Sequence, residues 1–398
     1  MKDLSDLTAR CIRCGFCLES CPTFILTGEE TESPRGRIYL VRSLNEGVLR
    51  DPESIREPID HCLGCLACET ACPSGVEYRS IIEQARAMVS PQEPVRRFLD
   101  GLTSPPRLRR QVALAKLWPG KKVPGFAMRG ISKEKPEAEK PRAQVPATWP
   151  ALSEEMLPPV RAEVYLLEGC AMRVMFSRVH EATRRLLRRL GYRVRESEAG
   201  CCGSLYGHQG FLDEAQSCLA QTFSAMPDDL PIVVNSAGCG NFLKDHEAAF
   251  SDAKRVVDLS EFLAREGLAA ALAGSPGFEE GITYHDACHL AHGQRIRSQP
   301  RDLLSAIPKV KYVELAEADM CCGSAGIYNL TEPSTARELL ERKWQNVERT
   351  GARWVVLANP GCHAWIDQVT REQGGHVRVL HLAEALEASF SGLSGLGA

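Results

Sequence analysis

The chain has 398 residues, a formal net charge of −3 and 25% charged residues, which suits two or three domains with ordinary cores. The nearly balanced charge gives no electrostatic drive toward nucleic acid, and no apolar run approaches the roughly 20 residues that span a bilayer. The first residues contain no apolar signal-peptide core, so we expect a cytoplasmic protein. The 17 cysteines are unusual, and in a reducing compartment they favour metal binding over a disulfide framework.

Eight cysteines fall within the first 72 residues, in two runs that each read C-x2-C-x2-C-x3-C followed by proline. This spacing is typical of two-cluster ferredoxins, in which three thiolates bind one cluster and the fourth binds the other. We therefore predict two [4Fe–4S] clusters with crossed ligands. The first would be held by Cys11, Cys14, Cys17 and Cys72, and the second by Cys62, Cys65, Cys68 and Cys21. Zinc sites are the alternative, but zinc has no use for a third cysteine at this spacing.

Helical periodicity surrounds the two runs. Apolar residues between 38 and 44 predict a short amphipathic helix that ends at Gly47, and residues 76–89 predict another. We thus expect residues 1–90 to form an α-helical ferredoxin-like domain. Arg35 and Arg37 either approach a cluster and raise its reduction potential or are ordinary surface residues.

Residues 91–159 hold 12 of the 24 prolines and several charged runs, which predicts a proline-rich linker. Its first part, residues 95–122, mixes apolar and basic residues. That composition suits contact with anionic lipid or a partner protein, and it also suits a helix that packs on its own domain.

From residue 160 onward, short apolar runs alternate with helical periods, and the cysteines reveal a repeat. The first set is Cys170, Cys201, Cys202 and Cys239, and the second is Cys288, Cys321, Cys322 and Cys362. Corresponding members of the two sets are 118, 120 and 123 residues apart, and glycine follows each vicinal pair. This predicts two α/β units, 160–275 and 276–398, whose cysteines gather beyond the strand ends.

Four thiols in one crevice favour a metal centre in each half. We prefer an iron–sulfur centre, with zinc or packed free thiols as alternatives. Cys218 lies outside these motifs, and we interpret it as a structural thiol in a helix over residues 212–223. The neighbouring histidines either support the ligands, move protons or are polar loop residues; they are His285, His289, His292 and His363.

One predicted helix carries a basic stretch next to the first of these halves. It would dock an acidic partner surface or the membrane, or form a solvated helix face. Its residues are Arg184, Arg185, Arg188 and Arg189.

The two cysteine runs, the segment PRGRIYL, the proline-rich linker and the two CCG halves, in this order, resemble the iron–sulfur subunit of glycolate oxidase (glycolate dehydrogenase) over nearly the whole chain. One subunit of anaerobic glycerol-3-phosphate dehydrogenase and the lactate-utilisation proteins are similar, and the CCG halves resemble one subunit of heterodisulfide reductase. The resemblance implies an α+β multi-domain electron-transfer subunit. It would relay electrons from a FAD-containing partner toward a quinone or other membrane carrier, and its partners would hold it at the inner face of the cell membrane.

Other members of this group offer different functions. The chain would then serve an anaerobic glycerol-3-phosphate or D-lactate dehydrogenase, or act as a heterodisulfide reductase-like thiol/disulfide oxidoreductase. The heterodisulfide reductase pattern has a fifth cysteine per half, where this chain has Phe242 and Trp365, which argues against disulfide cleavage. No G-x-G-x-x-G follows a predicted strand, so we expect FAD only in the partner and no catalytic residue for substrate oxidation in this chain.

Overall fold

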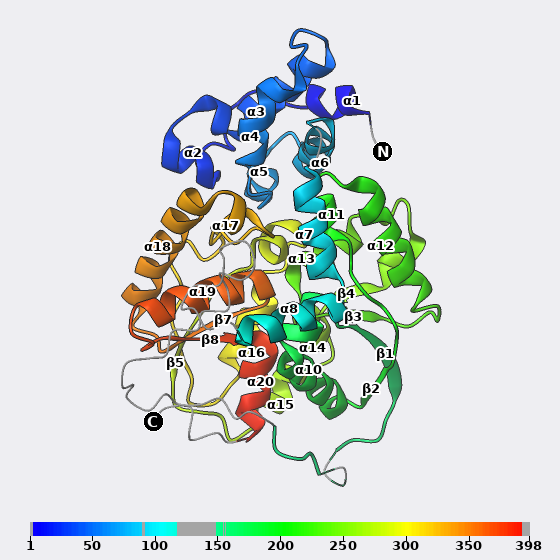
Figure 1. The fold of residues 1–398 in the computed structure, drawn as a ribbon. Coiled ribbons are helices and arrows are strands. Elements are labelled where there is room, and N and C mark those ends of the chain that lie inside the picture. Colours follow the sequence, from blue (N-terminus) through cyan, green and yellow to red (C-terminus); the bar gives the residue numbers. More distant parts are fainter. Residues whose placement is uncertain (1–2, 90–91, 118–148, 154, 156, 392–398) are drawn as a thin grey trace.

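The computed structural model describes residues 3–89, 92–117, 149–153, 155 and 157–391. A helical N-terminal part, blue in Figure 1, lies across one end of two α/β halves, the first green and the second yellow to red. About half of the predicted linker, including residues 118–148, lies outside the described residues. Among those that are described, no helix has both the length and the apolar character needed to cross a membrane.

The N-terminal part is built of short helices, as expected. The helix predicted to end at Gly47 is α3, which begins at Pro34, where proline suits the first helical position, and the Ser33 hydroxyl accepts a hydrogen bond from the Gly36 amide at 3.0 Å. Its apolar face packs against α6 in one buried cluster. The elements are α1 Leu4–Ala9, α2 Pro22–Thr27, η1 Glu30–Glu32, α3 Pro34–Asn45, η2 Pro52–Ile55, α4 Arg56–Asp60, α5 Ala67–Thr70 and α6 Tyr78–Met88.

Helices α7 (Glu93–Thr103) and α8 (Pro105–Leu117) contain the described part of the amphipathic segment. Leu99 of α7 is fully buried in the core of the first α/β half. The Tyr206 hydroxyl from that half donates to Asp100 Oδ1 at 2.7 Å. The sequence left three roles open for this segment: contact with lipid, contact with a partner, or packing within the chain. Helix α7 packs within the chain.

Each α/β half contains a four-stranded parallel sheet with the same strand order. The first sheet runs β2-β1-β3-β4 and the second β6-β5-β7-β8. This equal topology supports the repeat inferred from the cysteines. The strands are β1 Ala162–Leu167, β2 Tyr192–Arg195, β3 Ile232–Val234, β4 Val256–Asp258, β5 Gly281–Tyr284, β6 Lys311–Tyr312, β7 Trp354–Leu357 and β8 Arg378–His381.

Helices cover both sheets, and the halves share one hydrophobic core that includes Val164 and Leu186 of the first half with Val356 and Leu386 of the second. The first half contains α9 Ala171–Met175, α10 Ser177–Arg189, α11 Ser204–Gly207, α12 Leu212–Ser224, α13 Ala237–Lys244, η4 Ser251–Arg255, α14 Leu259–Arg265 and α15 Leu268–Ala273. The second contains η5 His289–Gly293, a π-helical turn, then α16 Ser298–Ser305, α17 Tyr328–Thr331, α18 Pro333–Thr350, α19 Pro360–Glu372 and α20 Leu382–Ser391.

Much of the basic stretch on α10 is engaged within the chain. Arg185 and Arg189 both form ion pairs with the fully buried Glu387 of α20, at 2.7 and 2.9 Å. Arg184 pairs with Glu168 and Glu196, each at 2.9 Å. These arginines therefore make ion pairs within the chain, two of them between the halves, instead of presenting free positive charge. The buried Arg185 therefore does not belong to a solvated helix face, and docking by the half-exposed members of the stretch stays a prediction.

Candidate functional site

Two small adjacent cavities in the N-terminal part separate the eight cysteines into two groups. One is lined by Cys11, Cys14, Cys17 and Cys72, and the other by Cys21, Cys62 and Cys65. Cys68 lines both cavities, so it lies between them. The fourth cysteine of each run thus faces the cysteines of the other run.

The two cavities differ in exposure. Cys14 is exposed, and the other members of its group, Cys11, Cys17 and Cys72, are partly exposed. Cys21 and the first three cysteines of the second run are buried. Beside the exposed group, Ile12 and Phe16 each have 68% of their surface open to solvent. One candidate cluster site is therefore at the surface, and the other is inside the molecule.

Polar groups approach the sulfurs of the buried group. The Arg37 side chain is 1% exposed, pairs with Glu32 at 2.7 Å, and places Nη1 3.9 Å from Cys21 Sγ. The Tyr78 hydroxyl and the Gly64 amide donate to Cys62 Sγ at 3.6 and 3.4 Å. Donors and positive charge at sulfur stabilise the reduced, more negative state of an iron–sulfur cluster. Of the two arginines predicted near a cluster, Arg37 is therefore a buried neighbour of these thiols.

Arg35 lies above the exposed group. Its side chain forms an ion pair with Glu30 at 2.7 Å. Burial raises the pKa of Cys17, and a hydrogen bond from the Arg35 backbone lowers it. Arg35 lines the cavity of the exposed group, and its side chain binds Glu30 and also donates from Nη1 to the Arg13 carbonyl within the first cysteine run at 3.4 Å.

In each α/β half the glycine after the vicinal cysteines determines the geometry. Gly203 and Gly323 have φ of +89° and +86°, in the left-handed region. A Cβ at either position would lie 2.6 or 2.5 Å from the carbonyl oxygen of Ala215 or Ala336. Only glycine fits, so helices α12 and α18 lie directly against the cysteine pairs. The single cysteines follow β1 and β5 or, for Cys239 and Cys362, lie in the first turns of α13 and α19.

The first half gathers five sulfurs. Interactions with Cys170, Cys202 and Cys218 raise the pKa of Cys201 well above its usual value. Cys202 in turn interacts with Cys239. The sequence suggested that Cys218 is separate from the motif. In the structure it lies beside the other thiols, on the face of α12 that adjoins them. Placing the two halves in register would have drawn attention to it, because its counterpart is Leu339.

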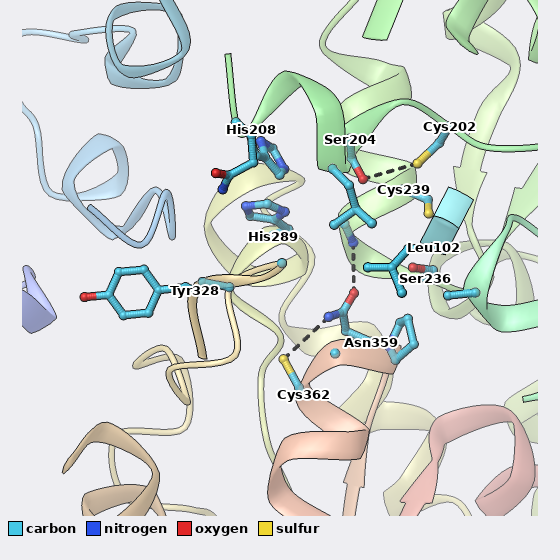
Figure 2. Close-up of a pocket in the computed structure, with 18 of the residues that line it drawn as sticks. Leu102, Cys202, Ser204, His208, Ser236, Cys239, His289, Tyr328, Asn359 and Cys362 are labelled. Carbon is cyan, nitrogen blue, oxygen red and sulfur yellow. Dashed lines mark hydrogen bonds between the residues drawn. The ribbon is translucent and has the colours of Figure 1, made fainter. Parts of the chain in front are cut away.

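The second half gathers four sulfurs. Interaction with Cys321 and burial raise the pKa of Cys288, and Cys322 interacts with Cys321 and Cys362. Asn359 donates from Nδ2 to Cys362 Sγ at 3.6 Å, and its Oδ1 accepts from the Gly238 amide of the first half at 3.2 Å (Figure 2). Asn359 therefore connects the two groups of cysteines.

A buried lysine, which the sequence analysis did not single out, also belongs to the second group. Lys343 of α18 is 2% exposed, and its Nζ donates to the carbonyls of Glu317 and Ala318. Burial lowers its pKa, and the charges of Cys322 and Cys321 raise it. Thr222 takes the equivalent place in the first half, where its hydroxyl donates to the Cys201 carbonyl at 3.0 Å.

The four candidate histidines have separate roles. The ring of His285 lies within 4.8 Å of Cys322 and Cys362, measured between ligand atoms. His289 contacts the Gly64 carbonyl at 2.9 Å, and burial lowers its pKa to about 3, so the ring is neutral. His292 contacts the Thr70 hydroxyl at 3.0 Å, and His363 packs edge-on against Phe176. Two of the four therefore hold the N-terminal part to the second half.

This junction brings the buried group of the N-terminal part close to the second half. Cys65 packs in the same core cluster as Cys321 and Cys322. Arg86 of α6 donates to the carbonyls of Cys62 and His208, which adds a contact with the first half. The inner ferredoxin cavity is therefore the one nearest to the cysteines of the repeats.

A cavity of about 530 Å³ lies between the two halves and is lined by cysteines of both. Figure 2 shows Cys202, Cys239 and Cys362 around it, with Asn359 between the two groups. Ionised thiols this close repel one another unless a cation holds them, and buried thiols beside hydrogen-bond donors are the ligands that iron–sulfur centres require. The residues present fit such centres. The cysteines on this cavity are Cys62, Cys170, Cys201, Cys202, Cys239, Cys288, Cys321 and Cys362.

A domain with two four-cysteine runs joined to two cysteine-rich α/β halves defines an iron–sulfur redox protein. The pattern of the 4Fe-4S dicluster domain matches residues 8–76, and that of the Cysteine-rich domain matches residues 164–244 and 282–367. The chain belongs to the family of glycolate oxidase iron–sulfur subunits, as the resemblance predicted. It is 33% identical to the probable glycolate oxidase iron-sulfur subunit of Bacillus subtilis (strain 168), covering 94% of this chain and 92% of the relative.

Two further relatives and one solved structure are also similar to this chain. The glycolate oxidase iron-sulfur subunit of Escherichia coli (strain K12) is 32% identical, over 98% of this chain and 95% of the relative. One subunit of the fumarate reductase (CoM/CoB) of Methanothermobacter marburgensis is 26% identical, over 96% of this chain and 72% of the relative. A hypothetical protein from Helicobacter pylori has the same fold, with a TM-score of 0.55 and 9% identity over 98% of this chain and 77% of that one.

Proposed function

We propose that this chain is the electron-transfer subunit of a complex that oxidises glycolate or a related 2-hydroxy acid, and that the oxidation takes place on a FAD-containing partner. The observation that carries the proposal is the row of cysteine groups from the exposed Cys14 to the cavity between the halves. The names of the relatives indicate the substrate class, and they indicate that the chain works as one subunit of a complex. Electrons would leave toward a quinone or another membrane carrier, and the chain would meet the membrane through its partners.

Two [4Fe–4S] clusters with crossed ligands would occupy the N-terminal cavities, since each cavity unites three cysteines of one run with the fourth of the other. When bound, the clusters supply one-electron carriers. The chain's own residues bind and tune them: Arg37 and Tyr78 direct donors toward the sulfurs of the inner group. A metal centre in each cysteine-rich half, iron–sulfur in preference to zinc, would continue the row.

In this proposal electrons pass along the row of cysteine groups in one direction, from the exposed group to the buried one. The first cluster would receive electrons, because Cys14 is exposed and the apolar side chains of Ile12 and Phe16 beside it offer a contact surface for the flavoprotein. The second cluster would pass them on, because Cys65 packs against Cys321 and Cys322.

Reconstitution tests the relay. The iron-loaded chain alone should not oxidise glycolate with an artificial acceptor, and adding the flavoprotein partner should restore turnover. Changing Ile12 and Phe16 together to Ser should weaken assembly with the partner at least tenfold. Val48→Ser is the matched control, since Val48 is 72% exposed but lies outside the cavity of the first group. Glycolate oxidation by the flavin-free chain would contradict the proposal.

The crossed ligands have their own test. Cys21→Ser should damage the cluster held by Cys62, Cys65 and Cys68, and Cys72→Ser should damage the other one. EPR spectra of the two reduced variants report which cluster signal is lost. Loss of the Cys11-side signal in the Cys21 variant would show that each run binds its own cluster.

A further inference from the structure

The second cysteine-rich half contains a buried imidazole that points at its thiols. His285 directly follows β5, three residues before Cys288, and is 1% exposed. Within the part of the chain that the structure describes, neither ring nitrogen has a hydrogen-bond partner. The Ala318 carbonyl lies near the ring without completing a hydrogen bond. A buried imidazole left this way is unfavourable, and its free ring nitrogens leave it able to bind a further partner.

The distances identify the kind of partner. The ligand atoms of His285, Cys322 and Cys362 all lie within 4.8 Å of one another. Metal–nitrogen and metal–sulfur bonds are about 2.0 to 2.3 Å long, so two ligands on one tetrahedral metal atom lie about 3.4 to 3.8 Å apart. A contraction of about 1 Å would bring these three groups onto a single metal atom. No other trio of histidine, cysteine and carboxylate groups in the described residues converges in this way.

The first half has no such group. The residue three positions before Cys170 is Leu167, which is buried in the apolar core beneath the first set of cysteines. In its place the first half brings Cys218 to its thiols. The imidazole is therefore specific to the second half and is not a shared feature of the repeat.

We propose that His285 binds one metal atom of the second centre together with Cys322 and Cys362, so that this centre has mixed nitrogen and sulfur ligands while the first has sulfur alone. The inference rests on the proposed function in one respect, because it assumes a metal in the second half. An imidazole is neutral where a thiolate is negative. The second centre would therefore carry less negative charge and accept an electron more readily than the first.

Spectroscopy on the full chain tests the ligand. Protein labelled with ¹⁵N-histidine, purified without oxygen and reduced, should show in pulsed EPR the strong nitrogen coupling of a bound imidazole. If the metal is zinc, X-ray absorption at the zinc edge should show a nitrogen neighbour. In His285→Gln this signature should disappear, and the metal content of the second half should fall at least twofold. His285→Cys should restore the metal without the nitrogen signature.

His363→Gln is the matched control, because His363 adjoins Cys362 in sequence but packs on Phe176; it should keep both the signature and the metal. Circular dichroism on each variant separates a lost ligand from a lost fold. An unchanged nitrogen signature and metal content in folded His285→Gln would overturn this inference but leave the proposed metal centres standing. Wild-type protein with only the eight irons of the N-terminal clusters and no zinc would overturn the inference together with the proposed centres.

Discussion

The two cysteine-rich halves have the same strand order and the same sequence of cysteines, yet they surround those cysteines with different side chains. Ala215 of α12 and Ala336 of α18 occupy equivalent places against the glycines of the two CCG motifs. Counting onward from them, Cys218 corresponds to Leu339 and Thr222 to Lys343. One helix face thus brings a fifth thiol and a hydroxyl to its centre, and the other brings an apolar side chain and a buried ammonium.

The comparison shows that one set of residues determines the backbone arrangement of the repeat and another set determines the charge around its cysteines. Glycines, strands and cysteines maintain the frame in both halves, while a few positions on the covering helix determine the charge. The second half, with Lys343 beside its cysteine pair, favours an added electron. It is also the half into which Cys65 of the N-terminal part packs. We infer that electrons enter the repeats through the second half.

The largest effect should come from removing one cysteine of each pair. Cys322→Ala should reduce partner-dependent electron transfer at least 100-fold and leave the first centre unreduced, because the entry point is lost. Cys202→Ala should leave reduction of the second centre at its normal rate. Rapid-freeze EPR after mixing with the reduced flavoprotein measures both. Equal behaviour of the two variants would show that the halves act in parallel.

Lys343→Met should produce the next largest effect. Removing the buried ammonium takes a positive charge away from Cys321 and Cys322, so the reduction potential of the second centre should fall by about 60 mV, which is about 1.4 kcal/mol for one electron. The carbonyls of Glu317 and Ala318 keep their backbone donors, Met320 and Asp286, but the loss of the charged hydrogen bonds from Nζ should also lower the free energy of unfolding by about 1–3 kcal/mol. Redox titration followed by EPR gives the potential. The exposed Lys311→Met is the control, and an equal shift there would remove the special role of Lys343.

Cys218→Leu makes the first half resemble the second at one position. If Cys218 contributes a thiolate to the first centre, its removal should raise the reduction potential of that centre and change its EPR spectrum. The free energy of unfolding should change by less than about 1.5 kcal/mol, since one apolar-like side chain replaces another. Leu339→Cys is the reciprocal variant for the second half. An unaltered spectrum in Cys218→Leu would return Cys218 to the structural role that the sequence suggested.

The smallest effect concerns the join between the halves. His381 Nε2 contacts the Asn235 carbonyl at 2.8 Å, and the Asn235 amide contacts His180 Nδ1 at 3.1 Å. Burial lowers the pKa of His381 to about 3 and that of His180 to about 4. An unfolded histidine titrates near 6.5, so the unfolded state binds more protons in this range. The stability is fully present above about pH 6.5 and is lost as the pH falls toward these values.

The size of that loss can be measured at mild acidity. For each histidine, the free energy of unfolding should fall by roughly 1.4 kcal/mol for each pH unit below 6.5. Urea unfolding of metal-free protein between pH 7.5 and 5.5 measures it. His381→Gln should show a shallower dependence on pH, and a slope identical to that of the wild type would place the acid sensitivity elsewhere.

Much of this organisation can be predicted from the sequence, because ligand spacing is a local property. The two C-x2-C-x2-C-x3-C runs predict the N-terminal domain, and the repeated CCG motifs predict the duplicated α/β unit that the sheets display. Residues whose role depends on contacts between distant segments were harder to find. The sequence separates Cys218 from the motifs, and no motif marks Lys343, because only the close approach of α12 and α18 at the two glycines places them beside the thiols.

The basic stretch on α10 also shows that a role which depends on distant contacts is hard to predict from the sequence. Four arginines within six residues indicate a positive surface when the chain is read locally. Arg184 pairs with the nearby Glu168 and Glu196, but the partner of Arg185 and Arg189 is Glu387, which is about 200 residues downstream and fully buried. A local charge pattern therefore does not show which of its residues are neutralised by distant parts of the chain.

The unequal burial of the two N-terminal cavities has a consequence for how the protein ages in air. Oxidants reach thiolates according to their exposure, so in the proposed relay a cluster at Cys14 should be lost before one at Cys65 and Cys68. Loss at that end would disconnect the chain from its proposed electron donor while the inner cluster remained intact. A partly oxidised preparation should then retain about half of its ferredoxin-type iron and have almost no partner-dependent activity, so iron content alone would overstate the active fraction.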